Sequence, residues 1–129
     1  HKDDDLVVED TSLYLNCMNG FPGPLNKWML KSIGNEGIYD LCKRYNNFNV
    51  SVKTVVGYKK KFGKVYFFED EIKGKVVFPI GDNGFGWDKI FVPEGFNKTF
   101  AQMTFEEKNQ ISMRKIAFDK FSRFLKDEY

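Results

Sequence analysis

The feature that most limits the choice of fold is a long alternation of side chains in the middle of the sequence. Over residues 48–60, apolar or β-branched residues alternate with more polar neighbours, which is the period of a strand with one buried face. The alternating positions are Val50, Val52, Thr54, Val56 and then Tyr58. A basic turn at residues 59–64 leads to a return strand over residues 65–68 and its continuation over 71–78. The pattern predicts a long β-hairpin with a bulge or bend at Gly74.

The N-terminal part contains an apolar run at residues 6–8 that predicts a short buried strand. Glu9, Asp10 and Thr11 follow this run directly. Because open α/β sheets bind ligands at the carboxyl ends of their strands, Asp10 and Thr11 are candidates for ligand chemistry. A solvated strand end, with Asp10 or Thr11 capping the next turn, explains the local pattern equally well.

Residues 20–24, with two glycines and two prolines, predict a rigid turn. A helix over about Leu25–Ile33 follows, with Pro24 suited to its first turn and Gly34 as the glycine that ends it. A second short helix is expected over about Glu36–Tyr45. The expected apolar face of the first helix consists of Trp28, Met29 and Leu25.

Lys27 lies early in the first of these helices, where the helix dipole disfavours a positive charge. A bound anion would explain a lysine at this position. A solvated lysine is the simpler explanation of this fact alone, so both interpretations stay open.

The C-terminal part begins with a short strand over residues 90–93. Thr104 and Glu107 have the spacing of a capping box, and they open a helical region that extends to about Lys126. Ser112 is a good N-cap, so we expect an interruption near residues 109–112 and a second helical start. The core-facing stripe of this region is Ile111, Phe118, Phe121 and Leu125.

The stretch from Gly84 to Arg114 contains groups suited to a flat, anionic ligand. Phe85 lies between two glycines, and Trp87 follows them directly before the carboxylate of Asp88. Lys108 and Arg114 follow, off the core-facing stripe. Rings can stack on a planar base while cations and polar groups bind its edge and its charge. The stretch therefore predicts nucleotide binding.

Composition excludes several other classes of protein. The 129 residues suffice for one domain, and a hydrophobic content of 42% is that of a globular chain. A formal charge of +2 does not by itself argue for nucleic-acid binding. Single-stranded nucleic acid bound through the abundant aromatic residues is a weaker alternative.

Cys17 and Cys42 form no closely spaced pair of the kind that zinc sites use. A disulfide between them is one alternative, and a reduced cytosolic pair is the one we favour. No apolar run reaches the roughly 20 residues of a membrane span, and no signal peptide is apparent. We therefore expect a cytoplasmic protein that binds neither membranes nor nucleic acid.

Taken in order, several segments of the chain resemble the inosine triphosphate pyrophosphatase (Ham1-like) family. Each segment alone is weakly specific, but the ordered set spans nearly the whole sequence. The matching segments are residues 7–13, residues 20–24 with Lys27-Trp28, residues 84–88 with Ile90-Phe91, residues 99–103, residues 107–109 and residues 112–114. The resemblance implies a single α/β domain over residues 1–129, with a curved mixed β-sheet, flanking helices and a cleft between two lobes.

The resemblance also implies an activity. Members of this family cleave the α–β phosphoanhydride of ITP, dITP and XTP with Mg²⁺, release pyrophosphate, and form homodimers. On matching positions, Asp10 would bind Mg²⁺ and act as the catalytic residue that orients or deprotonates the attacking water. Thr11 would lie beside it at the substrate, and Lys27 would hold the phosphates.

The resemblance assigns the base-binding half of the site to the Gly84–Arg114 stretch. Phe85 would stack on the purine, and Trp87 and Asp88 would close the pocket. Lys108 and Arg114 would donate hydrogen bonds to the O6 carbonyl, which adenine lacks. The full predicted set is Phe85, Gly86, Trp87, Asp88, Lys108, Met113 and Arg114.

Two departures from the family pattern carry expectations of their own. The N-terminal strand and helix of the family, with a Thr-Gly-Asn loop, a lysine and a second metal-binding glutamate, have no match before Leu6. Met113 replaces the usual histidine, and its thioether cannot donate to O6, so base discrimination should weaken. A catalytically impaired nucleotide-binding fragment or interaction module is therefore the alternative function.

Overall fold

The computed structural model describes residues 5–60 and 63–128, so the tip of the predicted hairpin at 61–62 lies outside the described residues. The strands are β1 (Leu6–Leu15), β2 (Pro22–Gly23), β3 (Asn49–Lys59), β4 (Val65–Val76) and β5 (Phe91–Pro93). The α-helices are α1 (Asn26–Arg44), α2 (Phe105–Ile111) and α3 (Met113–Glu128). Short 3-10 helices are η1 (Asn16–Met18), η2 (Gly86–Ile90) and η3 (Phe100–Gln102).

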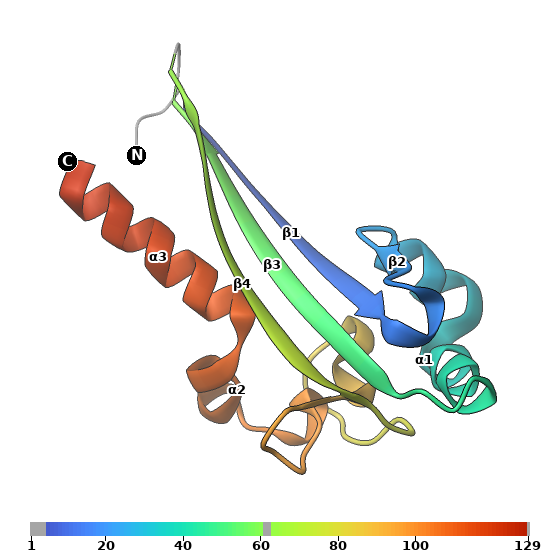
Figure 1. The fold of residues 1–129 in the computed structure, drawn as a ribbon. Helices are drawn as coiled ribbons and strands as arrows, with labels where there is room; N and C mark the ends of the chain where they lie inside the picture. Colours follow the sequence, from blue (N-terminus) through green and yellow to red (C-terminus); the bar gives the residue numbers. More distant parts are fainter. Residues whose placement is uncertain (1–4, 61–62, 129) are drawn as a thin grey trace.

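The strands form one curved sheet in the order β2-β1-β3-β4-β5. Strands β1, β3 and β4 pair over most of their length and extend away from the rest of the molecule as a long arm, which Figure 1 shows. The predicted hairpin is confirmed as β3 and β4, which pair without a break from Asn49↔Lys75 to Lys59↔Val65. Every strand pair is antiparallel, so the expected mixed sheet is corrected to an antiparallel one.

Of the two predicted alternatives at Gly74, a bulge or a bend, the bulge is wrong, because Gly74 pairs in register with Val50 on one side and Pro93 on the other. A glycine is needed there for a different reason. A Cβ on Gly74 would collide with the carbonyl oxygen of Val92 and lie 2.6 Å from Cε1 of Phe91. The glycine therefore permits β5 to approach β4 closely.

The first strand also differs from the prediction. Leu6 and Val8 are 57% and 53% exposed, so the run is not buried. The strand continues through Glu9, Asp10 and Thr11 because each residue as far as Leu15 pairs with β3. The acidic residues therefore lie in the middle of a strand and not at its carboxyl end.

Helix α1 consists of two helical segments that meet at Gly34, whose backbone φ of 70° confirms the predicted interruption. Its predicted apolar face is only partly correct. Trp28 is 63% exposed and Leu25 is 52% exposed, while Met29 packs against the core. In the part of the chain that the structure describes, no helix combines the length and the apolar content needed to cross a membrane.

Helix α3 covers one face of the arm, as Figure 1 shows. The predicted break between α2 and α3 is confirmed at Ser112, whose hydroxyl oxygen accepts a 3.3 Å hydrogen bond from the backbone N–H of Arg114. The predicted capping box at Thr104 and Glu107 is confirmed as well. The cluster between α3 and the sheet contains Val56, Tyr58, Ala117 and Phe121, with Val7, Tyr66, Phe68, Phe118, Phe124 and Leu125 packed around it.

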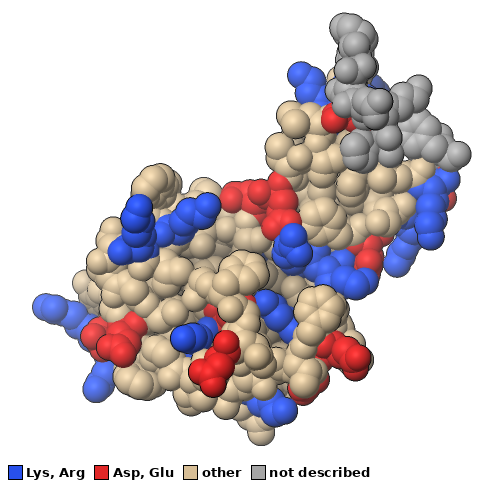
Figure 2. Space-filling view, turned by 180° about the vertical axis from the view of Figure 1, so that it is seen from behind, with Lys and Arg blue, Asp and Glu red and all other residues tan. Residues whose placement is uncertain are grey.

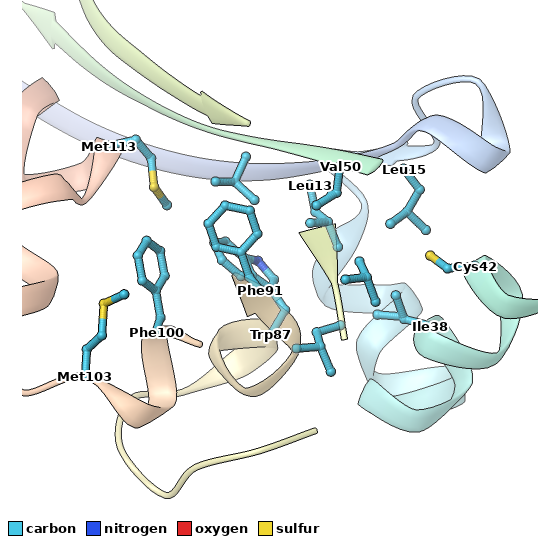
Figure 3. Close-up of a cluster of buried hydrophobic side chains, with 13 residues drawn as sticks. Leu13, Leu15, Ile38, Cys42, Val50, Trp87, Phe91, Phe100, Met103 and Met113 are labelled. Carbon is cyan, nitrogen blue, oxygen red and sulfur yellow. The ribbon is translucent and has the colours of Figure 1, made fainter. Parts of the chain in front are cut away.

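The main core lies in the body of the molecule, where η2, η3 and α1 meet the other end of the sheet (Figure 3). Trp87 packs edge-on against Phe91 with ring centroids 5.5 Å apart, and Phe91 packs against Phe100 at 5.1 Å. Cys42 lies in this core and Cys17 at its margin, both as free thiols with sulfurs 4.0 Å apart. Burial, and secondarily the neighbouring Cys17, raises the pKa of Cys42 to about 12.

The close approach at Gly74 makes a prediction about stability. Gly74→Ala should lower the free energy of unfolding in urea by about 2 kcal/mol, because β5 must move away from β4. Lys75→Ala, at the next position with an exposed side chain, should change it by less than about 0.5 kcal/mol. Equal effects of the two substitutions would contradict the close-approach explanation.

Candidate active site

The loop that carries Phe85 holds the ring away from the core. Gly84 and Gly86 have φ of 78° and 61°, which glycine adopts without strain, and they flank the extended backbone of Phe85. The ring of Phe85 is left 78% exposed. A side chain on Gly84 would collide with the carboxylate of Asp88, so the glycine also allows that carboxylate to lie under the loop.

Asp88 connects the loop to helix α2. Its carboxylate is buried, and Oδ2 accepts hydrogen bonds from the backbone N–H of Phe85 at 3.0 Å and from Nζ of Lys108 at 2.7 Å. The Lys108 ammonium also lies 5.3 Å from the ring centroid of Phe85. One carboxylate oxygen therefore fixes both an exposed ring and a cation beside that ring.

Arg114 lies in the first turn of α3, on the other side of the Ser112 break from Lys108. Its Nε–H group lies 2.8 Å and 2.9 Å from the two carboxylate oxygens of Glu9, and its Cζ lies 5.2 Å from the ring centroid of Phe118. The hydrogen bonding to Glu9 raises the pKa of Arg114, although partial burial opposes this. The guanidinium is therefore a fixed, permanent charge.

Two predicted base-binding residues are placed differently from the expectation. Trp87 is 7% exposed and Met113 is 4% exposed, and both side chains pack in the main core. Figure 3 shows the Met113 side chain pointing toward Phe100 and into the cluster. Their position makes them supports beneath the loop and α3, and not walls of an open pocket.

The predicted phosphate-side residues lie on β1 and α1. Side chains alternate along a strand, so Asp10 and Thr11 project from opposite faces of the sheet. The Thr11 hydroxyl is 3.0 Å from that of Thr54, on the face that also carries Glu9. Asp10 is exposed on the other face, and Lys27 is exposed in the first turn of α1.

Two asparagines that the sequence did not single out connect these parts. Asn26 donates from Nδ2 to the carbonyl oxygen of Thr11 at 2.7 Å, which joins the start of α1 to β1. Asn35 donates from Nδ2 to the carbonyl oxygen of Gly86 at 3.1 Å, which joins the second half of α1 to the Phe85 loop. Helix α1 therefore fixes the position of the Asp10–Thr11 segment relative to the Phe85 loop.

The Asp10 side of the site provides one carboxylate suited to Mg²⁺. No three His, Cys, Asp or Glu side chains among the described residues gather into a metal-binding group. Proteins commonly bind Mg²⁺ through one or two carboxylates, with waters and substrate phosphates as the other ligands. The exposed carboxylate of Asp10 fits one such ligand.

The surface is hollowed where the arm joins the body, and Figure 2 shows acidic and basic side chains gathered there. A separate hollow of about 520 Å³ lies at the end of β3 and β4 that is far from the turn joining them. It is lined in part by Ser51, Lys73, Lys75 and Phe96. It contains none of the predicted site residues. The predicted site residues therefore do not line this second hollow.

The sequence profile of the Ham1 family matches residues 1–124, nearly the whole chain. The chain belongs to the Ham1 family. Its fold agrees with that of the Ham1 protein of Staphylococcus aureus, at a TM-score of 0.81 and 27% identity over 97% of this chain and 68% of that one. A HAM1 protein from Coxiella burnetii, at 21% identity and a TM-score of 0.84, covers 95% of this chain and 68% of its own and shows the same fold.

Curated Ham1 relatives have names that describe nucleotide hydrolysis. The chain is 43% identical over 124 residues to a protein of Schizosaccharomyces pombe named inosine triphosphate pyrophosphatase. It is 41% identical over 123 residues to a protein of Methanopyrus kandleri named dITP/XTP pyrophosphatase. The matches cover 95% of this chain but 66% and 65% of those proteins, so the chain spans slightly less than two thirds of their length.

The double role of Asp88 predicts a graded response to substitution. Asp88→Asn keeps an oxygen acceptor for Phe85 but loses the charge that holds Lys108, so it should lower the unfolding free energy by about 2 kcal/mol. Asp88→Ala should lower the unfolding free energy further, because both hydrogen bonds to the carboxylate are lost. Glu69→Gln, which alters the exposed Lys53–Glu69 pair, should cost less than about 0.5 kcal/mol in the same urea titration. An Asp88→Asn effect no larger than the control would contradict this role.

Proposed function

We propose that this chain carries the base-binding side, and part of the phosphate-binding side, of a hydrolase acting on nonstandard purine nucleoside triphosphates. ITP, dITP and XTP would be cleaved to the monophosphate and pyrophosphate. The observation that carries the proposal is the exposed ring of Phe85, with the Lys108 ammonium beside it and both fixed by Asp88. The names of the S. pombe and M. kandleri relatives support the choice of substrate.

The base would stack on Phe85 while cations bind its edge. Lys108 and Arg114 are hydrogen-bond donors, and the O6 carbonyl of hypoxanthine or xanthine is an acceptor. The N6 amino group of adenine is itself a donor at the same position, so it would leave these cations without a partner. The preference for 6-oxo purines therefore follows from the donor character of the two side chains.

The phosphates would be bound from β1 and the start of α1. Lys27 would neutralise phosphate charge, and Asp10 would orient or deprotonate the attacking water and provide a metal ligand. Mg²⁺, when bound, would neutralise charge on the phosphoanhydride and on the leaving pyrophosphate. Glu9 and Asp10 project from opposite faces, and β2 pairs with β1 only at Leu13 and Tyr14. A triphosphate reaching from Arg114 to Asp10 would thus cross the open edge of β1.

The proposal includes a homodimer in the cytoplasm, and the family resemblance is its first support. A second support is an apolar patch on the face of the arm opposite α3. Across the sheet, Val8 pairs with Gly57 and Gly57 with Phe67, while Leu6 and Val65 flank Lys59 in the next row. The four apolar side chains are 50–67% exposed, a cluster of the kind that protein interfaces cover.

The activity is tested by measuring pyrophosphate release from ITP, dITP, XTP, ATP and GTP by the full-length protein, with Mg²⁺ and with EDTA. We expect Mg²⁺-dependent release from the first three nucleotides. Asp10→Asn should abolish turnover and keep most of the nucleotide binding, whereas Phe85→Ala should weaken binding itself. Turnover that survives Asp10→Asn would show that the metal assignment is wrong.

Two other outcomes would contradict the proposed activity. Binding of ITP without detectable release would favour the nucleotide-binding module. Equal rates for ITP and ATP would contradict the role of Lys108 and Arg114 as base-selecting donors.

The dimer is tested by light scattering on protein eluted from a sizing column. Phe67→Glu should shift the mass from dimer to monomer, because it places a charge in the apolar patch. Phe105→Glu is the matched control, since Phe105 is 80% exposed on α2 and lies outside the patch. A monomeric wild type, or equal effects of the two substitutions, would overturn the proposed interface.

A further inference from the structure

Arg114 is held at three points. Its backbone N–H binds the hydroxyl of Ser112, its Nε–H lies between the two carboxylate oxygens of Glu9, and its guanidinium lies over the ring of Phe118. A guanidinium is planar, so contacts to Nε and to one face fix both its position and the orientation of its plane.

These contacts leave the outer edge of the guanidinium available. A guanidinium has five N–H donors, and Glu9 takes the one on Nε. Within residues 5–60 and 63–128, no hydrogen bond from either Nη of Arg114 is present. Two parallel N–H groups on a fixed plane are suited to a planar carbonyl acceptor.

Stability alone does not explain the Glu9–Arg114 pair. The side chains of Glu9 and Arg114 are 28% and 55% exposed, and ion pairs that are this exposed to solvent contribute little to the free energy of folding. The Lys115–Asp119 pair on the same helix, at 2.8 Å, is also exposed, but it connects two residues of α3. Glu9 instead connects α3 to the middle of β1, directly beside Asp10.

We propose that Glu9 is a positioning residue that orients Arg114 toward the O6 carbonyl and so sets the preference for 6-oxo over 6-amino purines. The inference rests on the proposed function, and it adds a residue to which no role has been assigned. Glu9 acts through Arg114 and does not itself touch the nucleotide. Loss of Glu9 should therefore reduce base discrimination and leave stacking on Phe85 intact.

The test measures the dissociation constants of IMP and AMP by calorimetry on the full-length protein without metal. Monophosphates and the absence of Mg²⁺ separate base recognition from any effect on the neighbouring Asp10. In Glu9→Ala the ratio of the AMP to the IMP dissociation constant should fall about tenfold, as expected for one hydrogen bond to a charged group. The affinity for AMP should change less than about twofold, because stacking on the exposed Phe85 ring persists.

Two comparisons distinguish positioning from a general structural effect. Glu9→Gln keeps one oxygen acceptor for Nε and should give an intermediate ratio. In an Arg114→Ala background, Glu9→Ala should change the ratio no further, since the two side chains act as one unit. Asp119→Asn, which breaks the exposed pair on the same helix, should leave the ratio and the melting temperature unchanged.

The outcomes separate the role of Glu9 from the proposed function. A wild type that binds IMP and AMP equally would overturn the proposed function together with the role of Glu9. A selective wild type whose ratio survives both Glu9→Ala and Glu9→Gln would overturn the role of Glu9 alone. An equal loss in Asp119→Asn, or a further loss in the Arg114→Ala background, would also overturn it. If Glu9→Ala does not fold, the ratio in Glu9→Gln decides.

Discussion

The arrangement of the site depends on one buried carboxylate oxygen. Oδ2 of Asp88 accepts from the backbone of Phe85 and from the ammonium of Lys108, so an exposed ring on one loop and a cation on α2 share a single anchor. A buried acceptor left without donors is costly, which makes this double contact a strong constraint on the loop. The glycine at position 84 is required by the same contact, because any side chain there would occupy the space of the carboxylate.

The rest of the fold holds the other candidate site residues in position. The antiparallel arm and α3 bring Glu9 and Arg114 together, although they are 105 residues apart in sequence. Helix α1 holds β1 through Asn26 and the Phe85 loop through Asn35. The core beneath, with Trp87 and Met113 packed in it, supports the loop and the start of α3. Membership in the Ham1 family supports the proposal that a purine binds on the Phe85 side.

Local patterns predicted most of the elements, because their causes are local. Alternation predicted β3, the Thr104–Glu107 spacing predicted the start of α2, and Gly34 predicted the break in α1. Apolar character does not say whether another segment covers a side chain, so Trp28 and the 6–8 run were wrongly expected to be buried. The length of β1 was missed for a similar reason, since pairing with β3 continues the strand through the four polar residues from Glu9 to Ser12. The aromatic and basic residues of the Gly84–Arg114 stretch pointed to Phe85 and Lys108, but Glu9, Asn26 and Asn35 make their contacts with distant partners that no local spacing reveals.

The most direct test of this account is where a purine nucleotide binds on the protein. A titration of isotopically labelled protein with IMP, followed by ¹H–¹⁵N and aromatic ¹H–¹³C spectra, locates the contact residue by residue. We expect saturable shifts at the Phe85 ring, at the backbone of Asp88 and at the side chains of Lys108 and Arg114. Shifts confined to the hollow lined by Lys73, Lys75 and Phe96, with Phe85 and Lys108 unchanged, would contradict it.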